Sequence, residues 1–138
     1  MVTHLFVYGS LRQGFQNPVF DYISNHFEFV ANGRAAGQMF DLGDYPAAIP
    51  TEHVKGIVGE LYKAKSEADF FWAISQLDDY EGLHPEEGQH SEYVRAITSV
   101  AYDNTETEAW IYWYNGDVTG KPLIESGDVL EYIRNKQS

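Results

Sequence analysis

Residues 92–114 read EYVRAITSVAYDNTETEAWIYWY. Residues 92–102 and 107–114 alternate between polar residues and β-branched or aromatic ones, a pattern typical of β-strands. The residues between them, DNTE at 103–106, favour a turn. The sequence therefore predicts an antiparallel β-hairpin, and the strand period of two puts Tyr93 and Arg95 on the same face of it.

The N-terminal part of the chain predicts a strand, a glycine-containing loop and a short helix. Residues 5–8 are an apolar run of strand-forming residues that stops at Gly9 and Ser10. Asn17 and Pro18 then supply a helix N-cap followed by proline at the first helical position. We expect a helix of roughly 8–10 residues to follow.

The middle of the chain predicts curved β-structure. Residues 27–42 are strand-like but interrupted by Asn-Gly at 32–33 and by Gly37, which indicates a bent strand or a hairpin. Residues 41–50 are rich in turn-forming residues and predict a loop. Residues 54–62 resume strand alternation. Two glycines in this last stretch indicate bulges or close backbone approach: Gly56 and Gly59.

A helix is predicted to begin near residues 66–69, SEAD, which resemble a capping box with acidic residues in the first turn. Phe70, Ile74 and Leu77 follow at helical spacing and form its expected buried stripe. Gly82 is the expected stop. Glu81 therefore belongs to the C-terminal edge of this helix.

The order of these elements indicates one α+β domain. A chain of 138 residues has the length of a single compact domain, which excludes two independent ones. Residues 126–128 precede an apolar stretch that predicts a last short helix. We expect residues 1–138 to form one domain, built on a small, curved, mostly antiparallel β-barrel with flanking helices.

Charge and composition argue against several classes of function. Nine basic and 21 acidic residues give a net charge of −12, which disfavours binding to nucleic acid. The lack of cysteine fits a reducing compartment and excludes thiolate catalysis and cysteine-ligated zinc, and the five histidines lack HxxxH spacing. Neither a signal peptide nor an apolar run of about 18 residues occurs. We expect a cytoplasmic protein without membrane contacts or a metal.

Three sequence features could carry chemistry, and each has a structural alternative. Backbone N–H groups in the loop that starts at Gly9 could bind an anion, although strands often leave a core through Gly-Ser. Glu81 follows two aspartates at 78–79, so like-charge repulsion would raise its pKa toward that of a general base, unless all three are solvated. Tyr93 and Arg95 could orient an acidic group or form a surface pair.

Seven short motifs follow one another along the chain: VYGSLRQG (7–14), GQMFDLGDYPAAIP (37–50), VKGIVGELY (54–62), LDDYEG (77–82), SEYVR (91–95), TEAWIYWY (107–114) and IESGD (124–128). Each is weakly specific alone. Together, in this order and across nearly the whole chain, they resemble the γ-glutamylcyclotransferase-like superfamily, in its short bacterial, AIG2-related branch.

The resemblance implies a small β-barrel flanked by helices, with a cavity at one barrel mouth. It implies that Glu81 is the catalytic acid/base. The substrate-binding residues that it implies are Tyr8, Gly9, Ser10, Leu11, Tyr93, Arg95 and Tyr114. We expect these residues to converge on one cavity, and neither a metal nor an organic cofactor is expected to take part.

The implied reaction is an intramolecular aminolysis of a small γ-glutamyl compound. The α-amino group of the substrate attacks its own γ-carbonyl, closes 5-oxoproline and expels an amino acid or an amine. The alternatives are a γ-glutamyl-amine in place of a γ-glutamyl amino acid, another substrate class, or a binding domain without catalysis. Two departures bear on the substrate: Leu11 stands where the longer enzymes have asparagine, and Pro18 stands where branch members often have histidine.

Overall fold

The structure of the protein is a computed structural model, and it describes residues 2–8, 24–42, 46–51, 56–80, 93–128 and 131–132. The elements in chain order are β1 (His4–Val7), η2 (Ser24–His26), β2 (Phe27–Ala35), β3 (Gly37–Asp41), β4 (Pro46–Pro50), β5 (Ile57–Ala64), α2 (Glu67–Tyr80), β6 (Tyr93–Tyr102) and β7 (Thr105–Tyr114). The helix expected after Pro18 lies outside the described residues.

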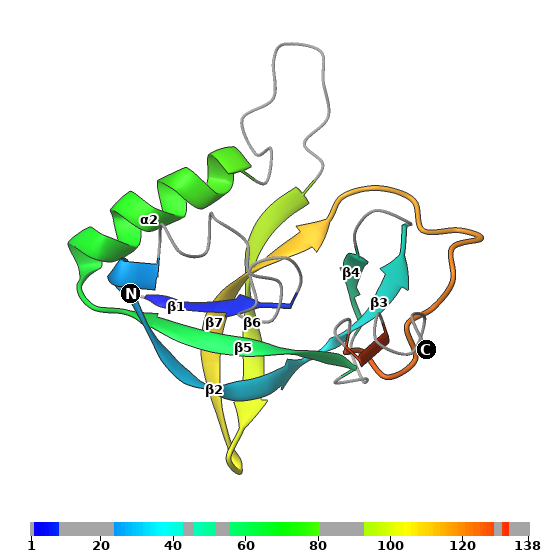
Figure 1. Ribbon diagram of the computed structural model, residues 1–138, viewed down its shortest axis with the longest axis horizontal. Coiled ribbons are helices and arrows are strands. Elements are labelled where there is room, and N and C mark those ends of the chain that lie inside the picture. The colour runs from blue at the N-terminus through cyan, green and yellow to red at the C-terminus, as the bar shows by residue number, and fades with distance from the viewer. Residues whose placement is uncertain are drawn as a thin grey trace.

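Five strands form a closed barrel in the order β1-β5-β2-β6-β7 (Figure 1). Neighbouring strands are antiparallel except for β1 and β7, which run parallel with Leu5 beside Trp110. Closure gives every barrel strand two neighbours, so these strands leave no open sheet edge. The predicted α+β class and mostly antiparallel barrel are confirmed.

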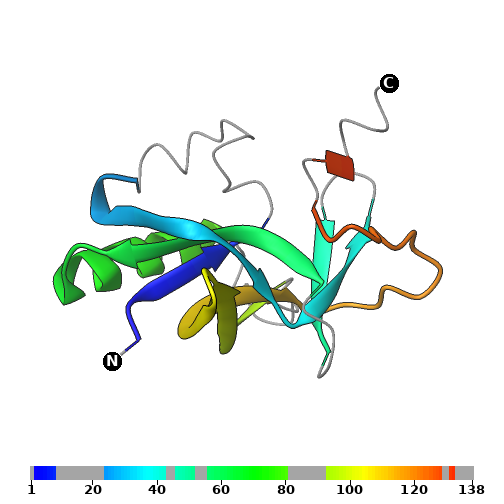
Figure 2. The same ribbon diagram turned by 90° about the horizontal axis from the view of Figure 1, so that it is seen from below.

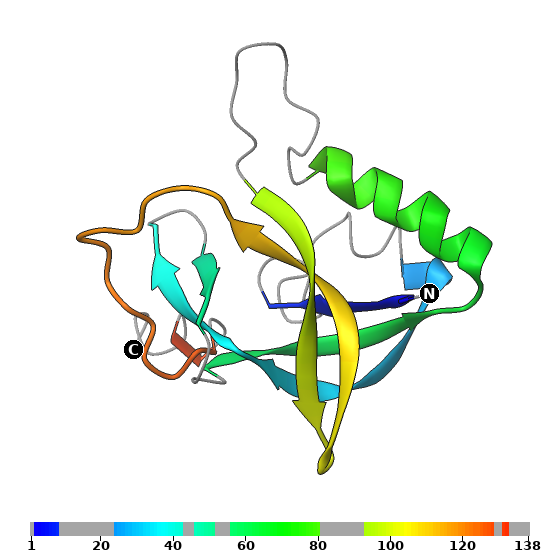
Figure 3. The same cartoon turned by 180° about the vertical axis from the view of Figure 1, so that it is seen from behind.

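The helix α2 and a two-stranded sheet of β3 and β4 lie at opposite ends of the barrel (Figures 1 and 2). Figure 3 shows the β6–β7 hairpin in front, with its turn projecting beyond the other strands. In the part of the chain that the structure describes, no helix has the length and apolar character that a membrane span requires.

The strand β4 shows that the loop predicted for residues 41–50 is wrong in its second half. Pro46–Pro50 pairs antiparallel with β3 along its whole length. The two prolines are the first and last residues of the strand, where a missing N–H is tolerated, and Ala47 and Ala48 between them are fully buried. The prolines favoured the prediction of a loop, although these residues form a short strand with a buried centre.

The expected bend in residues 27–42 is present, as a bent strand rather than a hairpin. The register between β2 and β5 shifts between Phe29 and Ala31, and the chain then leaves the barrel after Ala35 to begin β3 in the other sheet. Gly33, expected to interrupt the strand, lies within it. A Cβ at this position would lie 2.9 Å from Cγ1 of Val100, so the glycine permits close approach of β6.

The β6–β7 hairpin is confirmed, with a shorter connection than expected. Every residue of β6 pairs with a residue of β7. Only Asp103 and Asn104 connect the strands, with φ values of 45° and 63°. Two successive positive φ angles are characteristic of a type I′ turn, which matches the twist of paired strands. Thr105 and Glu106, expected in the turn, belong to β7.

Two apolar clusters lie on the two faces of the barrel wall. Along β1, Phe6 belongs to one cluster, and Leu5 and Val7 belong to the other, because successive strand residues face opposite sides. The second cluster includes the apolar stripe of α2 and holds the helix against the barrel. The predicted stripe is confirmed, since its three members are nearly or fully buried: Phe70, Ile74 and Leu77.

The N-terminus of α2 has the predicted cap. Oγ of Ser66 accepts a hydrogen bond from the backbone N–H of Asp69 at 3.1 Å and donates one to the Asp69 carboxylate at 2.8 Å. The same carboxylate pairs with Nδ1 of His26 at 2.7 Å, and the His26 ring stacks near Trp72 with centroids 4.4 Å apart. Asp69 therefore joins the start of the helix to η2.

This pairing makes the stability of the fold depend on pH in the acidic range. The hydrogen bonds from His26 and then Ser66 lower the pKa of Asp69 below its ordinary 3.8. A lowered pKa in the folded state means that the stabilisation is present above pH 3.8 and is lost as the pH falls through the folded value. We expect the stability difference between the wild type and Asp69→Asn to shrink on acidification, as measured by urea unfolding at several pH values. A constant difference would contradict this assignment.

The chain that follows β7 returns across the small sheet to the start of β5. The N–H of Ile124 donates to the carbonyl of Met39 at 2.8 Å, and the N–H of Val58 donates to the carbonyl of Gly127 at 2.8 Å. Ile124 is buried. Of the predicted last helix, residues 131–132 are described and are helical.

Candidate functional site

Four of the eight predicted site residues are described, and the topology places them at one end of the barrel. Because β1 and β7 are parallel, they end on the same side, and the antiparallel β6 begins there. Tyr8 directly follows β1, Tyr114 ends β7, and Tyr93 and Arg95 lie at the start of β6. The other four lie outside the described residues: Gly9, Ser10, Leu11 and Glu81.

Tyr93 and Tyr114 form an aromatic pair at this end. They face each other in the β6–β7 register, with ring centroids 5.7 Å apart at an interplanar angle of 70°. The Tyr93 hydroxyl donates to the carbonyl of Pro46 at 3.4 Å. Gly116 packs beside the Tyr114 ring, since a Cβ there would lie 2.6 Å from Cζ. Neighbouring strand and loop residues therefore restrict both rings.

Arg95 pairs with a residue that the sequence interpretation did not select, Asp78 in the last turn of α2. Nε and Nη2 of Arg95 donate to the two carboxylate oxygens of Asp78 at 2.8 and 3.1 Å. The hydroxyl of Tyr112 donates to the same carboxylate at 2.8 Å. The guanidinium carbon lies 4.4 Å from the centre of the Trp110 ring. Asp78 thus accepts three hydrogen bonds although it is only 6% exposed.

The position of Asp78 explains both its burial and its need for a cation. It is four residues after Ile74 and next to Leu77, so helical periodicity puts it on the buried stripe. A carboxylate at a helix C-terminus is unfavourable because the carbonyl ends there carry partial negative charge. Arg95 offsets both effects. The helical spacing from Ile74 was the signal in the sequence that Asp78 would be buried.

Tyr112 contacts both segments that the resemblance associates with the site. Its backbone carbonyl accepts a hydrogen bond from the hydroxyl of Tyr8, and its own hydroxyl donates to Asp78. Tyr8 is the first of the predicted substrate-binding residues at 8–11, and Asp78 lies three residues before Glu81. One β7 residue therefore connects the end of β1 with the end of α2.

A second buried carboxylate lies on β5. Glu60 is 7% exposed, is paired in register with Val7 of β1, and accepts a hydrogen bond from the hydroxyl of Tyr62 at 2.9 Å. Across the described ranges, histidine and acidic side chains do not gather into any group of three or more that could hold a metal ion.

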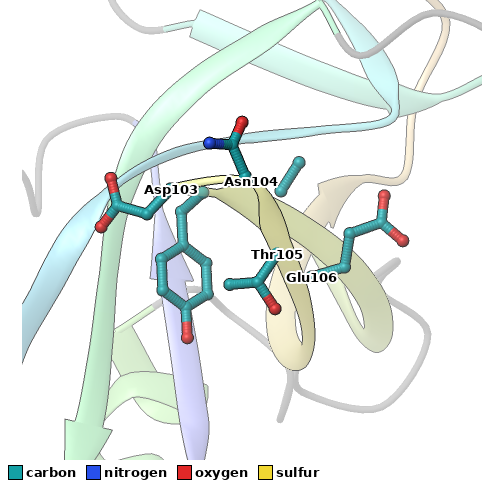
Figure 4. Close-up of a pocket in the computed structure, with 6 residues that line it drawn as sticks. Asp103, Asn104, Thr105 and Glu106 are labelled. Carbon is teal, nitrogen blue, oxygen red and sulfur yellow. The ribbon is translucent and has the colours of Figure 1, made fainter.

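A surface hollow of about 600 Å³ lies at the other end of the β6–β7 hairpin (Figure 4). It is lined by residues 101–106, and the carboxylates of Asp103 and Glu106 lie on opposite sides of the turn. None of the predicted site residues lines it. The hairpin thus separates this hollow from Tyr93 and Tyr114 by the length of its strands.

Breaking the pair of Asp78 and Arg95 is expected to destabilise the fold. Arg95→Met leaves a buried carboxylate without its cation, and we expect the free energy of unfolding to fall by about 3 kcal/mol, because the Arg95 side chain is partly exposed. Asp78→Asn should also be destabilising, and the double variant should lose less than the sum. Urea unfolding of the four proteins measures this coupling. Additive losses would contradict a direct interaction.

Comparisons with known proteins agree with this architecture. The family model described as "Gamma-glutamyl cyclotransferase, AIG2-like" matches residues 5–131. MJ1514 of Methanocaldococcus jannaschii, whose name assigns it provisionally to the gamma-glutamylcyclotransferases, is 32% identical over 133 residues, covering 95% of this chain and 98% of that protein. YtfP of Escherichia coli K12, a "Gamma-glutamylcyclotransferase family protein", is 30% identical over 134 residues, covering 92% and 96%.

Two solved structures share the fold. The solution structure of YtfP from Escherichia coli superimposes with a TM-score of 0.60 at 28% identity, covering 94% of this chain and 98% of that one. The crystal structure of YkqA from Bacillus subtilis gives 0.69 at 26% identity and covers 100% of this chain, which spans only 44% of YkqA. Family match, relatives and fold agree, and the chain belongs to the gamma-glutamyl cyclotransferase, AIG2-like family.

Proposed function

We propose that the protein is a γ-glutamylcyclotransferase that releases 5-oxoproline from a small γ-glutamyl amino acid or γ-glutamyl-amine. The observation that carries the proposal is the family match over residues 5–131, together with the glutamate of LDDYEG at position 81. The placement of Tyr8, Tyr93, Arg95 and Tyr114 at one barrel end supports it.

In the proposed reaction the α-amino nitrogen of the substrate attacks its own γ-carbonyl carbon. The new C–N bond closes the five-membered ring, the bond to the leaving nitrogen breaks, and one proton moves from the attacking nitrogen to the leaving one. A carboxylate can carry that proton, first as a base and then as an acid, and Glu81 is assigned this role. The reaction as written needs no oxidant or second substrate.

The predicted loop residues and the Tyr93–Tyr114 pair are proposed to hold the substrate in a folded conformation. An extended γ-glutamyl chain cannot cyclise, so binding it with amine and carbonyl in contact supplies much of the rate. The backbone N–H groups of Gly9, Ser10 and Leu11 are assigned to the substrate carboxylate or the developing oxyanion. Tyr93 and Tyr114 are proposed to bound the substrate, because their paired rings lie at the same barrel end.

A direct assay tests the proposal. Purified protein is incubated with a panel of γ-glutamyl dipeptides and γ-glutamyl-amines, and 5-oxoproline is measured by chromatography against a heated-protein blank. Turnover of dipeptides alone, or of amines alone, would define the substrate class. Binding of these compounds without 5-oxoproline would instead indicate a binding domain, and neither binding nor turnover would overturn the proposal.

A further inference from the structure

The side chains that join α2 to the β6–β7 hairpin are arranged to fix the end of the helix. Asp78 is held from two strands at once, by both donors of the Arg95 fork from β6 and by the Tyr112 hydroxyl from β7. A bidentate charge-assisted pair restricts orientation as well as distance. The last turn of α2 is therefore held in one position against the hairpin.

The guanidinium of Arg95 is largely occupied within the protein. Its Nε and Nη2 edge faces Asp78, its Cζ lies over the Trp110 ring, and its side chain is 23% exposed. A substrate carboxylate would have to share the guanidinium with a buried carboxylate that already binds it in the bidentate manner. The contacts favour an indirect role for Arg95, exerted through Asp78.

We propose that Asp78, Arg95 and Tyr112 are positioning residues that set where the carboxylate of Glu81 is presented to the substrate. This inference rests on the proposed function, because it assigns the chemistry to Glu81. Glu81 follows Asp78 by three residues, and α2 ends at Tyr80, so the place where the last turn of α2 is held fixes the point from which the chain continues toward Glu81. The backbone carbonyl of Tyr112 also accepts a hydrogen bond from Tyr8. Tyr112 therefore connects the end of α2 with the end of β1, where the predicted substrate-binding residues begin.

A positioning role and a substrate-binding role for Arg95 have different kinetic signatures. Loss of a group that binds the substrate equally in ground and transition states raises KM and leaves kcat unchanged. Loss of a group that aligns the catalytic carboxylate lowers kcat with little change in KM, since a misplacement of about 1 Å can cost about a hundredfold. The positioning role therefore predicts a kcat effect.

Tyr112→Phe is the sharpest test, because it removes the hydroxyl that holds Asp78 and keeps the backbone carbonyl that holds Tyr8. We expect kcat for 5-oxoproline release to fall about ten- to a hundredfold, with KM changed by less than about twofold. Tyr132→Phe is the matched control: its hydroxyl donates to the Asp41 carboxylate at 2.9 Å, away from α2, and both constants should stay near the wild type.

Asp78→Asn and Arg95→Met separate the two roles of the arginine. If both residues act through the end of α2, each variant lowers kcat with KM nearly unchanged, and the double variant resembles the worse single one. If Arg95→Met raises KM while Asp78→Asn does not, Arg95 binds the substrate and the proposal is overturned for that residue.

A measurement that does not depend on activity completes the test. Amide hydrogen exchange of residues 77–80 should speed up in Tyr112→Phe, while residues 67–72 and the Tyr132→Phe control stay as in the wild type. Unchanged exchange at 77–80 would overturn the anchoring of the helix, whatever the kinetics. Faster exchange with unchanged kcat would overturn its catalytic relevance. An inactive wild type would overturn the proposed function and leave the anchoring to be judged by exchange.

Discussion

Glu81→Gln is expected to lower the rate of 5-oxoproline release by about 100- to 10,000-fold, the usual contribution of a general acid/base. The amide has nearly the shape of the carboxylate but cannot accept the proton from the attacking amine. We expect the melting temperature and the binding of a γ-glutamyl compound to change little. Steady-state kinetics and thermal unfolding of the purified variant measure both expectations.

The matched control for this variant is Glu108→Gln on β7. Glu108 is exposed, and the substitution makes the same change of one charge. Its activity should equal that of the wild type. If Glu81→Gln kept activity within a few-fold of wild type, Glu81 would have no part in the mechanism, and a large drop in melting temperature would make its role structural.

Gly127→Ala is expected to lower the free energy of unfolding by about 4 kcal/mol or more, because it combines a steric clash with backbone strain. Gly127 has a φ of 69°, and its carbonyl accepts a hydrogen bond from Val58 at 2.8 Å. A Cβ at this position would lie on the carbonyl group of Gly56, only 2.5 Å from its carbon. The backbone of β5 or of the C-terminal segment must therefore move. Urea unfolding or the melting temperature measures the loss.

Gly120→Ala separates the steric clash from the backbone strain. Gly120 has a similar φ of 78°, but nothing lies within 4 Å of the position of an added Cβ. Its substitution should lower the free energy of unfolding by only roughly 1–2 kcal/mol, the cost of holding an alanine in the left-handed conformation. Equal losses for the two variants would show that close packing against Gly56 contributes little.

Local signals in the sequence predicted the elements whose causes are themselves local. The capping box at Ser66, the apolar stripe of α2 and the turn of the β6–β7 hairpin depend on residues within a few positions of one another. The order of these elements then indicated a curved, mostly antiparallel barrel, and the structure confirms it. Sequence motifs also identified the family, because several of them in order are far more specific than any one.

Features that depend on partners distant in sequence could not be predicted in the same way. The strand β4 exists because β3 covers it, and its prolines conceal this in the sequence. Gly33 lies within a strand because β6 approaches it closely. The burial of Asp78 follows helical periodicity, but its partners, Arg95 and Tyr112, are known only once the hairpin is placed against α2.

The parallel contact between β1 and β7 has a consequence for how the protein acquires its structure. Tyr8 and Tyr112 are 104 residues apart along the chain, and Val2 and Trp110, which are also hydrogen-bonded, are 108 apart. Closing so long a loop costs conformational entropy before the contacts it allows can form, so barrel closure is a late step in folding. While the chain is still being synthesised, the β1 strand edge that β7 covers stays unpaired until residues 105–114 have left the ribosome.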